Sequence, residues 1–374
     1  MDPSERVALG ATPLRVTRLG LGTVPIGGQF GPVTVTEAHA VIRRSYELGI
    51  RMFDTAPQYG LGLAERRIGE VLPELPRADI VLATKVGRLI RPVSFVSKVG
   101  HVLRQAPSRR RNGIKLVGSK AWRVVRRATF GNSSDIRLGT PFDRGSRALG
   151  EVFDFSYDGV MRSFEESLRR LGTDHVDILH IHDPDDHYAE ALSGAYKALD
   201  KLRGEGAIGA IGAGMRQSAM LSRFAREADF DCFLLAGRYT LLDQTALTDL
   251  LPLCVEKRIG VVLGGVYNSG ILVDPRPGAL FDYEAATGHW VKRAQRLKAV
   301  CDRHSVPLMA AAIQFPLAHP AVATVLTGVA STAELETNVR MFRTQIPPAL
   351  WQELRAEGLL AEEAPVPTVS SVVG

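Results

Sequence analysis

Short apolar runs recur along the chain at intervals that leave room for a helix between one run and the next. Each run is almost continuously apolar and does not alternate with polar residues, which is typical of parallel strands buried on both faces. Eight such runs are found, and eight parallel strands are the number that closes a barrel. The runs are Leu19–Thr23, Arg51–Asp54, Ile80–Lys85, Val176–His182, Ile208–Gly212, Asp231–Leu235, Gly260–Gly264 and Val322–Leu326.

Amphipathic helical patterns fill the intervals, and their alternation with the strands predicts an α/β fold, a (β/α)8 TIM barrel. A doubly wound sheet is the runner-up, but Pro25 stands where the third glycine of its nucleotide-binding fingerprint would be. Residues 7–21 predict an N-terminal β-hairpin that plugs the barrel floor, and residues 305–333 predict a buried helix, a turn and a buried strand. The expected helices include 36–48, 157–171, 189–203, 244–257 and 332–342.

The composition is that of an ordinary globular chain, with 45% hydrophobic and 23% charged residues over 374 positions. That length suits one barrel, so we expect a single domain over 1–374 with a flexible tail at 362–374.

The three cysteines form no Cys-x-x-Cys pair, which argues against a disulfide framework and a thiolate metal site. The N-terminus lacks the apolar core of a signal peptide and no segment predicts a membrane span, so we expect a cytoplasmic protein.

One segment, residues 86–150, carries most of the positive charge. It holds 15 Lys and Arg against two Asp, or +13, so the rest of the chain sums to −7. The segment interrupts the alternation after the third barrel strand and is long for a connecting loop, which predicts a basic insertion on the loop side of the barrel. Our hypothesis is a substrate lid that also docks on an anionic lipid surface or an acidic partner. Nucleic-acid binding is not expected, because no recognition motif accompanies the charge.

Tyr59, Lys85 and Asp54 are the first candidates for chemistry. Hydride transfer to a carbonyl needs a proton donor, and a tyrosine with its ordinary pKa of about 10 serves poorly near neutrality unless a cation lowers that pKa. Lys85 ends a barrel strand and therefore faces the loop-lined mouth where barrel enzymes place their chemistry. A buried ammonium requires a counter-charge, and Asp54 at the end of the preceding strand is placed to supply it.

A histidine at the end of the fourth strand is the candidate for binding the substrate oxygen. His182 and His180 are both available, and because alternation gives them the same orientation, periodicity does not separate them. The position of His182 nearer the carboxyl end of the strand favours it, and a satisfied interior histidine is the favoured interpretation of His180.

Four motifs, in order, resemble the aldo-keto reductase superfamily. They are Phe53-Asp54-Thr55-Ala56-Pro57-Gln58-Tyr59-Gly60, Glu65 with Ile68-Gly69, Ala83-Thr84-Lys85, and Val176-Asp177-Ile178-Leu179 leading to His182. The resemblance covers most of residues 7–360 apart from the insertion, and implies a catalytic tetrad of Asp54, Tyr59, Lys85 and His182. Three further segments, Asp154–Asp158, Phe233–Leu242 and Gly264–Gly270, are similar to the bacterial aldose 1-dehydrogenase branch. This branch includes L-fucose dehydrogenases and, more distantly, L-galactose and pyridoxal 4-dehydrogenases. That similarity implies oxidation of a sugar at C1 to a lactone, with Tyr59 as the base.

The resemblance also implies a nicotinamide site, with departures from the usual pattern. The common Ser-Asn pair after the fifth strand appears as Gly214-Met215, and a glutamine on the sixth strand aligns with Ala236. Glu334 occupies a position where NADPH-specific relatives carry a cation, so NAD is favoured over NADP because a 2′-phosphate would meet a like charge. The expected cofactor-binding residues are Gly22, Thr23, Asp54, Gly214, Met215, Tyr239, Gly265, Asn268, Ser269, Gly270, Gly328, Ser331, Glu334 and Asn338. Tyr239 either stacks near the nicotinamide or packs beneath the loop.

Four functions are compatible with these residues. The leading one is an NAD-dependent aldose dehydrogenase. An NADPH-dependent aldehyde or ketone reductase and a pyridoxal dehydrogenase-like enzyme are the alternatives with turnover, and a cofactor-loaded sensing subunit is the alternative without it. The complete tetrad argues against the last.

Overall fold

The computed structural model describes residues 1–92 and 149–368 of the 374. Its contacts divide the chain into two compact units, Met1–Arg88 with Phe153–Gly374, and Leu89–Val152. The first unit holds the barrel. The expectation of a single domain stays a prediction.

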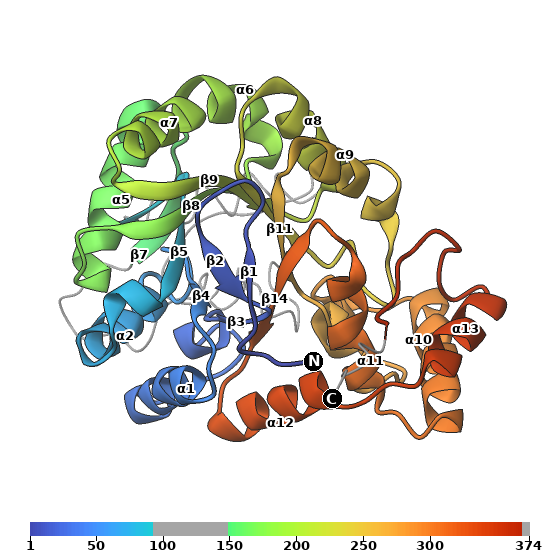
Figure 1. The fold of residues 1–374 in the computed structure, drawn as a ribbon. Helices are drawn as coiled ribbons and strands as arrows, with labels where there is room; N and C mark the ends of the chain where they lie inside the picture. The colour runs from blue at the N-terminus through green and yellow to red at the C-terminus, as the bar shows by residue number, and fades with distance from the viewer. Residues whose placement is uncertain (93–148, 369–374) are drawn as a thin grey trace, which may run out of the picture. The chain divides into compact units, whose positions relative to one another are not determined.

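Eight parallel strands form a closed barrel, as the sequence predicted, in the order in which they follow one another along the chain (Figure 1). The last and the first of them, β14 and β3, pair in parallel and complete the closure. The strands are β3 (Leu19–Gly22), β4 (Met52–Asp54), β5 (Val81–Val86), β8 (Val176–His182), β9 (Ile208–Met215), β10 (Cys232–Ala236), β11 (Gly260–Gly264) and β14 (Val322–Gly328).

The strand side chains alternate between two cores, which is why the runs in the sequence are continuously apolar. Met52, Ala83 and Ile178 belong to a small cluster inside the barrel. Leu82 and Leu179, their neighbours in sequence, belong to the larger cluster that the strands share with the helices. Position 85 has the orientation of Ala83, and positions 180 and 182 have that of Ile178, so these three polar side chains are directed inward.

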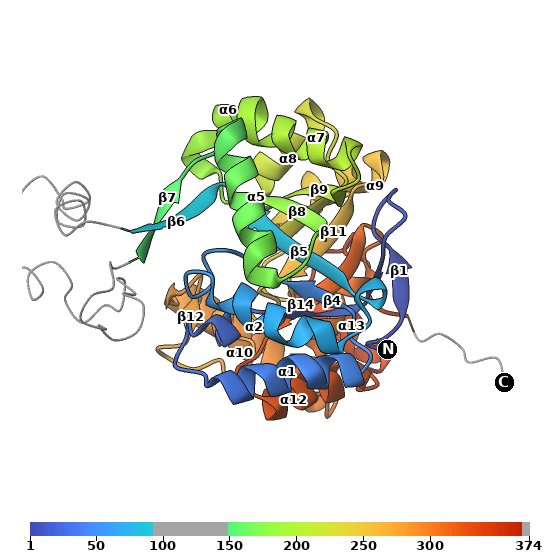
Figure 2. The same cartoon turned by 90° about the vertical axis from the view of Figure 1, so that its left-hand side faces the viewer.

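Helices surround the strands of this unit (Figure 1). In Figure 2, α1 and α2 lie side by side, with α5 and α12 next to them. α1 begins with a capping box in which Thr34 and Glu37 bond each other's backbone N–H groups. The helices are α1 (Val35–Glu47), α2 (Leu63–Val71), α5 (Tyr157–Leu171), α6 (Tyr188–Glu190), α7 (Lys197–Gly204), α8 (Ser218–Glu227), α9 (Leu250–Lys257), α10 (Gly288–Arg303), α11 (Leu308–Gln314), α12 (Thr332–Arg343) and α13 (Pro348–Ala356).

The predicted N-terminal hairpin is confirmed. β1 (Arg6–Ala8) and β2 (Arg15–Thr17) pair antiparallel, and Leu9 and Val16 join the cluster inside the barrel. The hairpin therefore supplies the apolar side chains that close the barrel at the end opposite the carboxyl termini of the strands.

Two helix expectations need correction. Residues 189–203 form no single α-helix, because a π-helical stretch, Ala191–Tyr196, lies between α6 and α7. Residues 244–257 begin with a separate 3-10 turn, Thr245–Leu247, before α9 starts. The segment 305–333 does contain a buried helix, a turn and a buried strand, namely α11, Phe315–Ala318 and β14.

The ends of the predicted insertion are strands that the sequence did not reveal. β6 (Arg88–Pro92) and β7 (Leu149–Phe153) form a two-stranded sheet. Residues 93–148 lie outside the described residues, so the lid and docking hypothesis for 86–150 stays a prediction. Within the predicted tail, 362–374, Ala364 is buried and its carbonyl accepts a hydrogen bond from Arg355 at 2.6 Å, and the flexibility of the tail stays a prediction. In the described ranges, no helix is long and apolar enough to cross a membrane.

Candidate active site

The four predicted catalytic residues meet at the carboxyl ends of three neighbouring strands. Asp54 is the last residue of β4, Lys85 lies one residue before the end of β5, and His182 is the last residue of β8. These strands are adjacent in the barrel, and Tyr59 follows on the loop after β4. All four side chains are buried or nearly so, with exposures from 1% for Lys85 to 8% for Tyr59.

Lys85 and Asp54 form a buried ion pair. Lys85 Nζ donates to Asp54 Oδ1 at 2.8 Å and to Oδ2 at 2.7 Å, and its third bond goes to the carbonyl of Thr55 at 2.8 Å. The three bonds use all three protons of the ammonium, which is what makes burial of this charge tolerable. Burial raises the pKa of Asp54, and the Lys85 charge opposes that rise.

Tyr59 lies against this pair and against His182. Lys85 Nζ is 4.8 Å from the centre of the Tyr59 ring, and the rings of Tyr59 and His182 meet edge to face with centres 6.1 Å apart. The pKa of Tyr59 is raised well above its ordinary value by burial and further by the charges of Asp54 and Asp183. The sequence had predicted a lowered pKa. In this structure burial outweighs the cation, because the Lys85 ammonium is already compensated by Asp54.

The two histidines of β8 have different environments. His182 lies at the mouth beside Tyr59, and burial, followed by the charge of Arg88, lowers its pKa well below the ordinary value, so its ring is neutral. His180 is fully buried one layer deeper, and burial lowers its pKa to about 3. Neither of its ring nitrogens has a hydrogen-bond partner among the described residues, so the expectation that His180 is satisfied is wrong, although it is an interior residue. Gly212 makes room for it, since a Cβ at that position would come within 2.1 Å of His180 Nδ1. The structure thus brings His182, and not His180, next to Tyr59.

Arg88 and Asp183 are two residues of this mouth that sequence reasoning missed. Arg88 Nη2 donates to Asp183 Oδ2 at 2.8 Å, and the same oxygen is 3.6 Å from His182 Nε2. The sequence could have indicated both residues, because each lies just after a strand that carries a tetrad member.

Glu65, which belongs to the motif that carries the resemblance, lies outside this site. Its carboxylate is fully buried and accepts bonds from Thr84 Oγ1 at 2.7 Å and from Arg170 Nε at 2.5 Å. Glu65 therefore connects α2 to β5 and to α5 through buried hydrogen bonds.

The expected cofactor residues on β3 and β9 lie at the barrel mouth. Gly22 ends β3, paired with Asp54 on one side and Gly328 on the other. The hydroxyl of Thr23 is used within the protein, because it donates to the Asp54 carbonyl at 2.9 Å. A Cβ added at Gly214 would lie 3.8 Å from the Lys85 side chain, so this position borders Lys85. The side chain of Met215 packs in the outer core and is directed away from the mouth.

The loop after β11 contains four of the expected residues, and its polar atoms are largely occupied. The Asn268 amide donates to the Gly237 carbonyl at 3.1 Å and accepts from Thr240 Oγ1 at 2.7 Å. Ser269 Oγ accepts the backbone N–H of Tyr283. Gly265 and Gly270 have positive φ values that turn the chain. These bonds fold the loop and use the Asn268 side-chain oxygen and one of its two amide protons, and the pyrophosphate contact expected of Asn268 stays a prediction.

The start of α12 carries the remaining expected residues. Ser331 is its N-cap and accepts from the Glu334 N–H, and Glu334 Oε2 accepts the N–H of Ala330 at 2.7 Å. Asn338 Oδ1 accepts from the Tyr267 hydroxyl at 3.0 Å. Gly328, at the end of β14, packs closely on the ring of Pro25. The helix start expected to receive an anion is thus capped by the carboxylate of Glu334.

Tyr239 has the surroundings of a core residue. It is fully buried and packs on Phe315 and His319, with ring centres 5.3 and 5.5 Å away. Of the two roles that the sequence left open, packing is therefore favoured over stacking on a cofactor.

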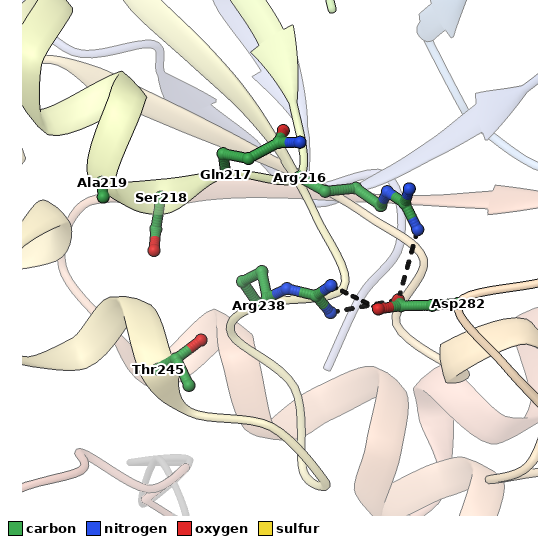
Figure 3. A pocket seen from close by; sticks show the side chains of 7 residues that line it. All are labelled: Arg216, Gln217, Ser218, Ala219, Arg238, Thr245 and Asp282. Atoms are coloured by element: carbon green, nitrogen blue, oxygen red, sulfur yellow. Dashed lines mark hydrogen bonds and ion pairs between the residues drawn. The ribbon is translucent and has the colours of Figure 1, made fainter. Parts of the chain in front are cut away.

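A second polar cluster follows the ends of β9 and β10 (Figure 3). Arg238 binds Asp282 through both of its terminal nitrogens, and Arg216 Nη1 lies 3.7 Å from the same carboxylate. These three side chains line a cavity of about 360 Å³ together with the first residues of α8. Asp282 lies at the turn between β12 (Leu280–Phe281) and β13 (Glu284–Ala285), so the arginines hold this short hairpin.

Comparisons with known proteins agree with this geometry. Residues 18–357 match the Aldo/keto reductase family. The chain is 40% identical to a pyridoxal 4-dehydrogenase of Microbacterium luteolum, covering 96% of this chain and 99% of the relative. It is 38% identical to a D-threo-aldose 1-dehydrogenase of a Pseudomonas species, covering 96% and 98%. Among solved structures, the aldo-keto reductase AKR11C1 of Bacillus halodurans in its holo form superposes with a TM-score of 0.66 at 24% identity, covering 98% of each chain. The chain therefore belongs to the aldo/keto reductase family of oxidoreductases.

Proposed function

We propose that the protein is an NAD-dependent dehydrogenase that oxidises the C1 hydroxyl of an aldose to a lactone. The observation that carries the proposal is the buried ring of Tyr59, which lies 4.8 Å from the ammonium of the Lys85–Asp54 pair and meets the neutral ring of His182 edge to face. The relative with 38% identity, named D-threo-aldose 1-dehydrogenase, supports the substrate class.

Small residues at the mouth fit a flat nicotinamide ring. A Cβ added at Gly214 or Gly264 would make only ordinary contacts, at 3.5 Å or more. Packing within the protein therefore does not require glycine at either position. We assign the ring to the space beside these residues, and its phosphates to the backbone near Gly22, Gly265 and Gly270. A nicotinamide bound there supplies the acceptor or donor of hydride.

The protein groups handle the proton and the orientation of the substrate. In oxidation, the substrate hydroxyl bonds to a ring nitrogen of His182, its proton passes to the oxygen of Tyr59, and the hydrogen on C1 leaves as hydride. Tyr59 accepts this proton as a tyrosinate, so its phenol must first release its own proton to solvent, and the Lys85 ammonium lies 4.8 Å from the ring. In reduction, the neutral phenol is already the proton donor, which agrees with the raised pKa of Tyr59.

NAD is proposed over NADP on the basis of Glu334. Its carboxylate bonds the Ala330 N–H at the start of α12, where helix geometry otherwise favours an anion. A 2′-phosphate at this helix start would compete with Glu334 and be repelled by it.

The test is reduction of NAD and, separately, of NADP with L-fucose, D-arabinose, L-galactose, pyridoxal and simple alcohols as substrates. We expect sugar-dependent formation of NADH, and a slower reaction with NADP. If pyridoxal is the only compound oxidised, the proposed sugar substrate is replaced by pyridoxal, the substrate named for the relative with 40% identity. A faster reaction with NADP would contradict the role of Glu334.

A further inference from the structure

Arg88 and Asp183 are placed at the mouth by two unusual backbone turns. Gly87, between β5 and Arg88, has a φ of +99°, and a Cβ there would come within 2.1 Å of the Phe155 ring, so only glycine fits. Asp183 has a φ of +40°, and its N–H is fixed on the Gly214 carbonyl at 2.9 Å. A non-glycine residue in this conformation carries strain, and such strain is concentrated at functional sites.

The pair is more accessible than the tetrad beside it. Asp183 exposes 32% of its side chain and Arg88 exposes 16%, whereas every tetrad residue is at most 8% exposed. The charges of both side chains act on the Tyr59 hydroxyl, with Asp183 raising and Arg88 lowering its pKa, in addition to the larger effect of burial. The pair therefore borders the reacting group and faces outward from it.

The carboxylate of Asp183 keeps one oxygen available. Arg88 binds Oδ2, and in the described part of the chain no hydrogen bond reaches Oδ1. Asp177, at the other end of β8, makes a useful comparison. Its carboxylate binds Arg77 at the same 2.8 Å and also accepts the Leu82 N–H, so it ties neighbouring strands together. Among the described residues, the Asp183 side chain accepts no backbone N–H of a barrel strand, and its hydrogen-bond donor is the side chain of Arg88, the first residue of β6.

We infer that Asp183, held in place by Arg88, binds the substrate hydroxyl on the carbon next to the reacting carbon. His182 Nε2 and Asp183 Oδ2 are 3.6 Å apart, so two vicinal oxygens of one substrate reach both groups. An ionised carboxylate is a strong acceptor for a hydroxyl donor. The pair thus selects sugars and other α-hydroxy carbonyl compounds over simple aldehydes. This inference rests on the proposed function, in which His182 binds the reacting oxygen.

The experiment compares two aldehydes that differ only in the hydroxyl group on the carbon next to the carbonyl. D-lactaldehyde (2-hydroxypropanal) and propanal are reduced by the wild type and by Asp183→Asn, and kcat/KM is measured for each. Asparagine keeps the size of the side chain and accepts a positive φ. Because any change in Tyr59 affects both aldehydes alike, the ratio of the two kcat/KM values isolates recognition of the hydroxyl.

We expect the kcat/KM ratio of D-lactaldehyde to propanal to fall about tenfold or more in Asp183→Asn, the effect of weakening one charged hydrogen bond. The control, Asp177→Asn, removes a matched Arg–Asp pair at the far end of the same strand and should leave the ratio unchanged. An unchanged ratio in Asp183→Asn, or equal losses for both aldehydes, would show that the pair is only structural.

The outcomes separate this inference from the proposed function. A shifted ratio in an enzyme that oxidises no sugar would retain Asp183 as the hydroxyl-binding residue and reject the aldose substrate. Sugar oxidation with an unshifted ratio would reject the role of Asp183 alone. A wild type that reduces neither aldehyde would overturn the chemistry at Tyr59 and the inference with it.

Discussion

At the scale of single residues, Gly212 shows how a barrel strand is fitted around a buried histidine. A Cβ at this position would lie 2.1 Å from His180 Nδ1 and 3.1 Å from Cys232 Sγ, and all three residues are inside the barrel. We therefore predict that Gly212→Ala lowers the free energy of unfolding by about 1–3 kcal/mol, the usual effect of overpacking. Urea denaturation of the purified protein measures it.

Gly214→Ala is the matched control, two residues further along β9 and with the same orientation. Its nearest contact would be 3.5 Å, which is ordinary packing distance. Its free energy of unfolding should stay within about 0.5 kcal/mol of the wild type. Equal losses in the two variants would mean that the space around His180 does not determine the residue at 212.

The tetrad could be predicted from the sequence, whereas Arg88 and Asp183 could not. Asp54, Lys85 and His182 occupy ends of strands that hydrophobic runs reveal, so their meeting follows from the fold. The pairing of Arg88 with Asp183 depends on the left-handed backbone at Gly87 and Asp183. No periodicity encodes that conformation, and the pKa of Tyr59 likewise depends on burial that spacing does not give.

At the scale of elements, long and strongly patterned segments were predictable and short ones were not. α5 spans Tyr157–Leu171, the range that its pattern predicts. β12 and β13 have two residues each, too few for any alternation to be recognised. β6 and β7 were missed because they flank a segment in which apolar and basic residues are mixed. Local contacts of the expected cofactor residues also could not be predicted from spacing: Asn268 bonds the Gly237 carbonyl and Tyr239 packs on Phe315.

The β12–β13 hairpin yields a prediction at this scale. Asp282 and Tyr283 at its turn both have positive φ values, and Arg238 holds Asp282. We predict that Arg238→Gln speeds hydrogen exchange of the amides in residues 280–286 by about fivefold, as expected for loss of a half-buried ion pair. Exchange measured by mass spectrometry tests this.

Arg276→Gln is the control for that experiment. Arg276 pairs with Asp274 on the same loop, but both side chains are about two-thirds exposed, so the pair contributes little. Its loss should leave exchange in the hairpin unchanged. Equal protection in Arg238→Gln and the wild type would mean that Arg238 does not restrain the hairpin.

At the scale of the whole molecule, closure of eight parallel strands is what assembles the site. β4, β5 and β8 come from distant parts of the sequence, yet their carboxyl ends lie side by side. The number of apolar runs and their alternation with helices predicted this closure. The role of residues 86–150 follows from no such pattern, because net charge alone does not specify a partner.

The most direct test of the account is the turnover and cofactor affinity of Tyr59→Phe, with Tyr46→Phe on α1 as the control. The account predicts that kcat falls at least about 100-fold, while the Kd for the nicotinamide cofactor stays within about twofold, and that Tyr46→Phe keeps its activity. Turnover retained by Tyr59→Phe would contradict the assignment of Tyr59 as the group that transfers the proton.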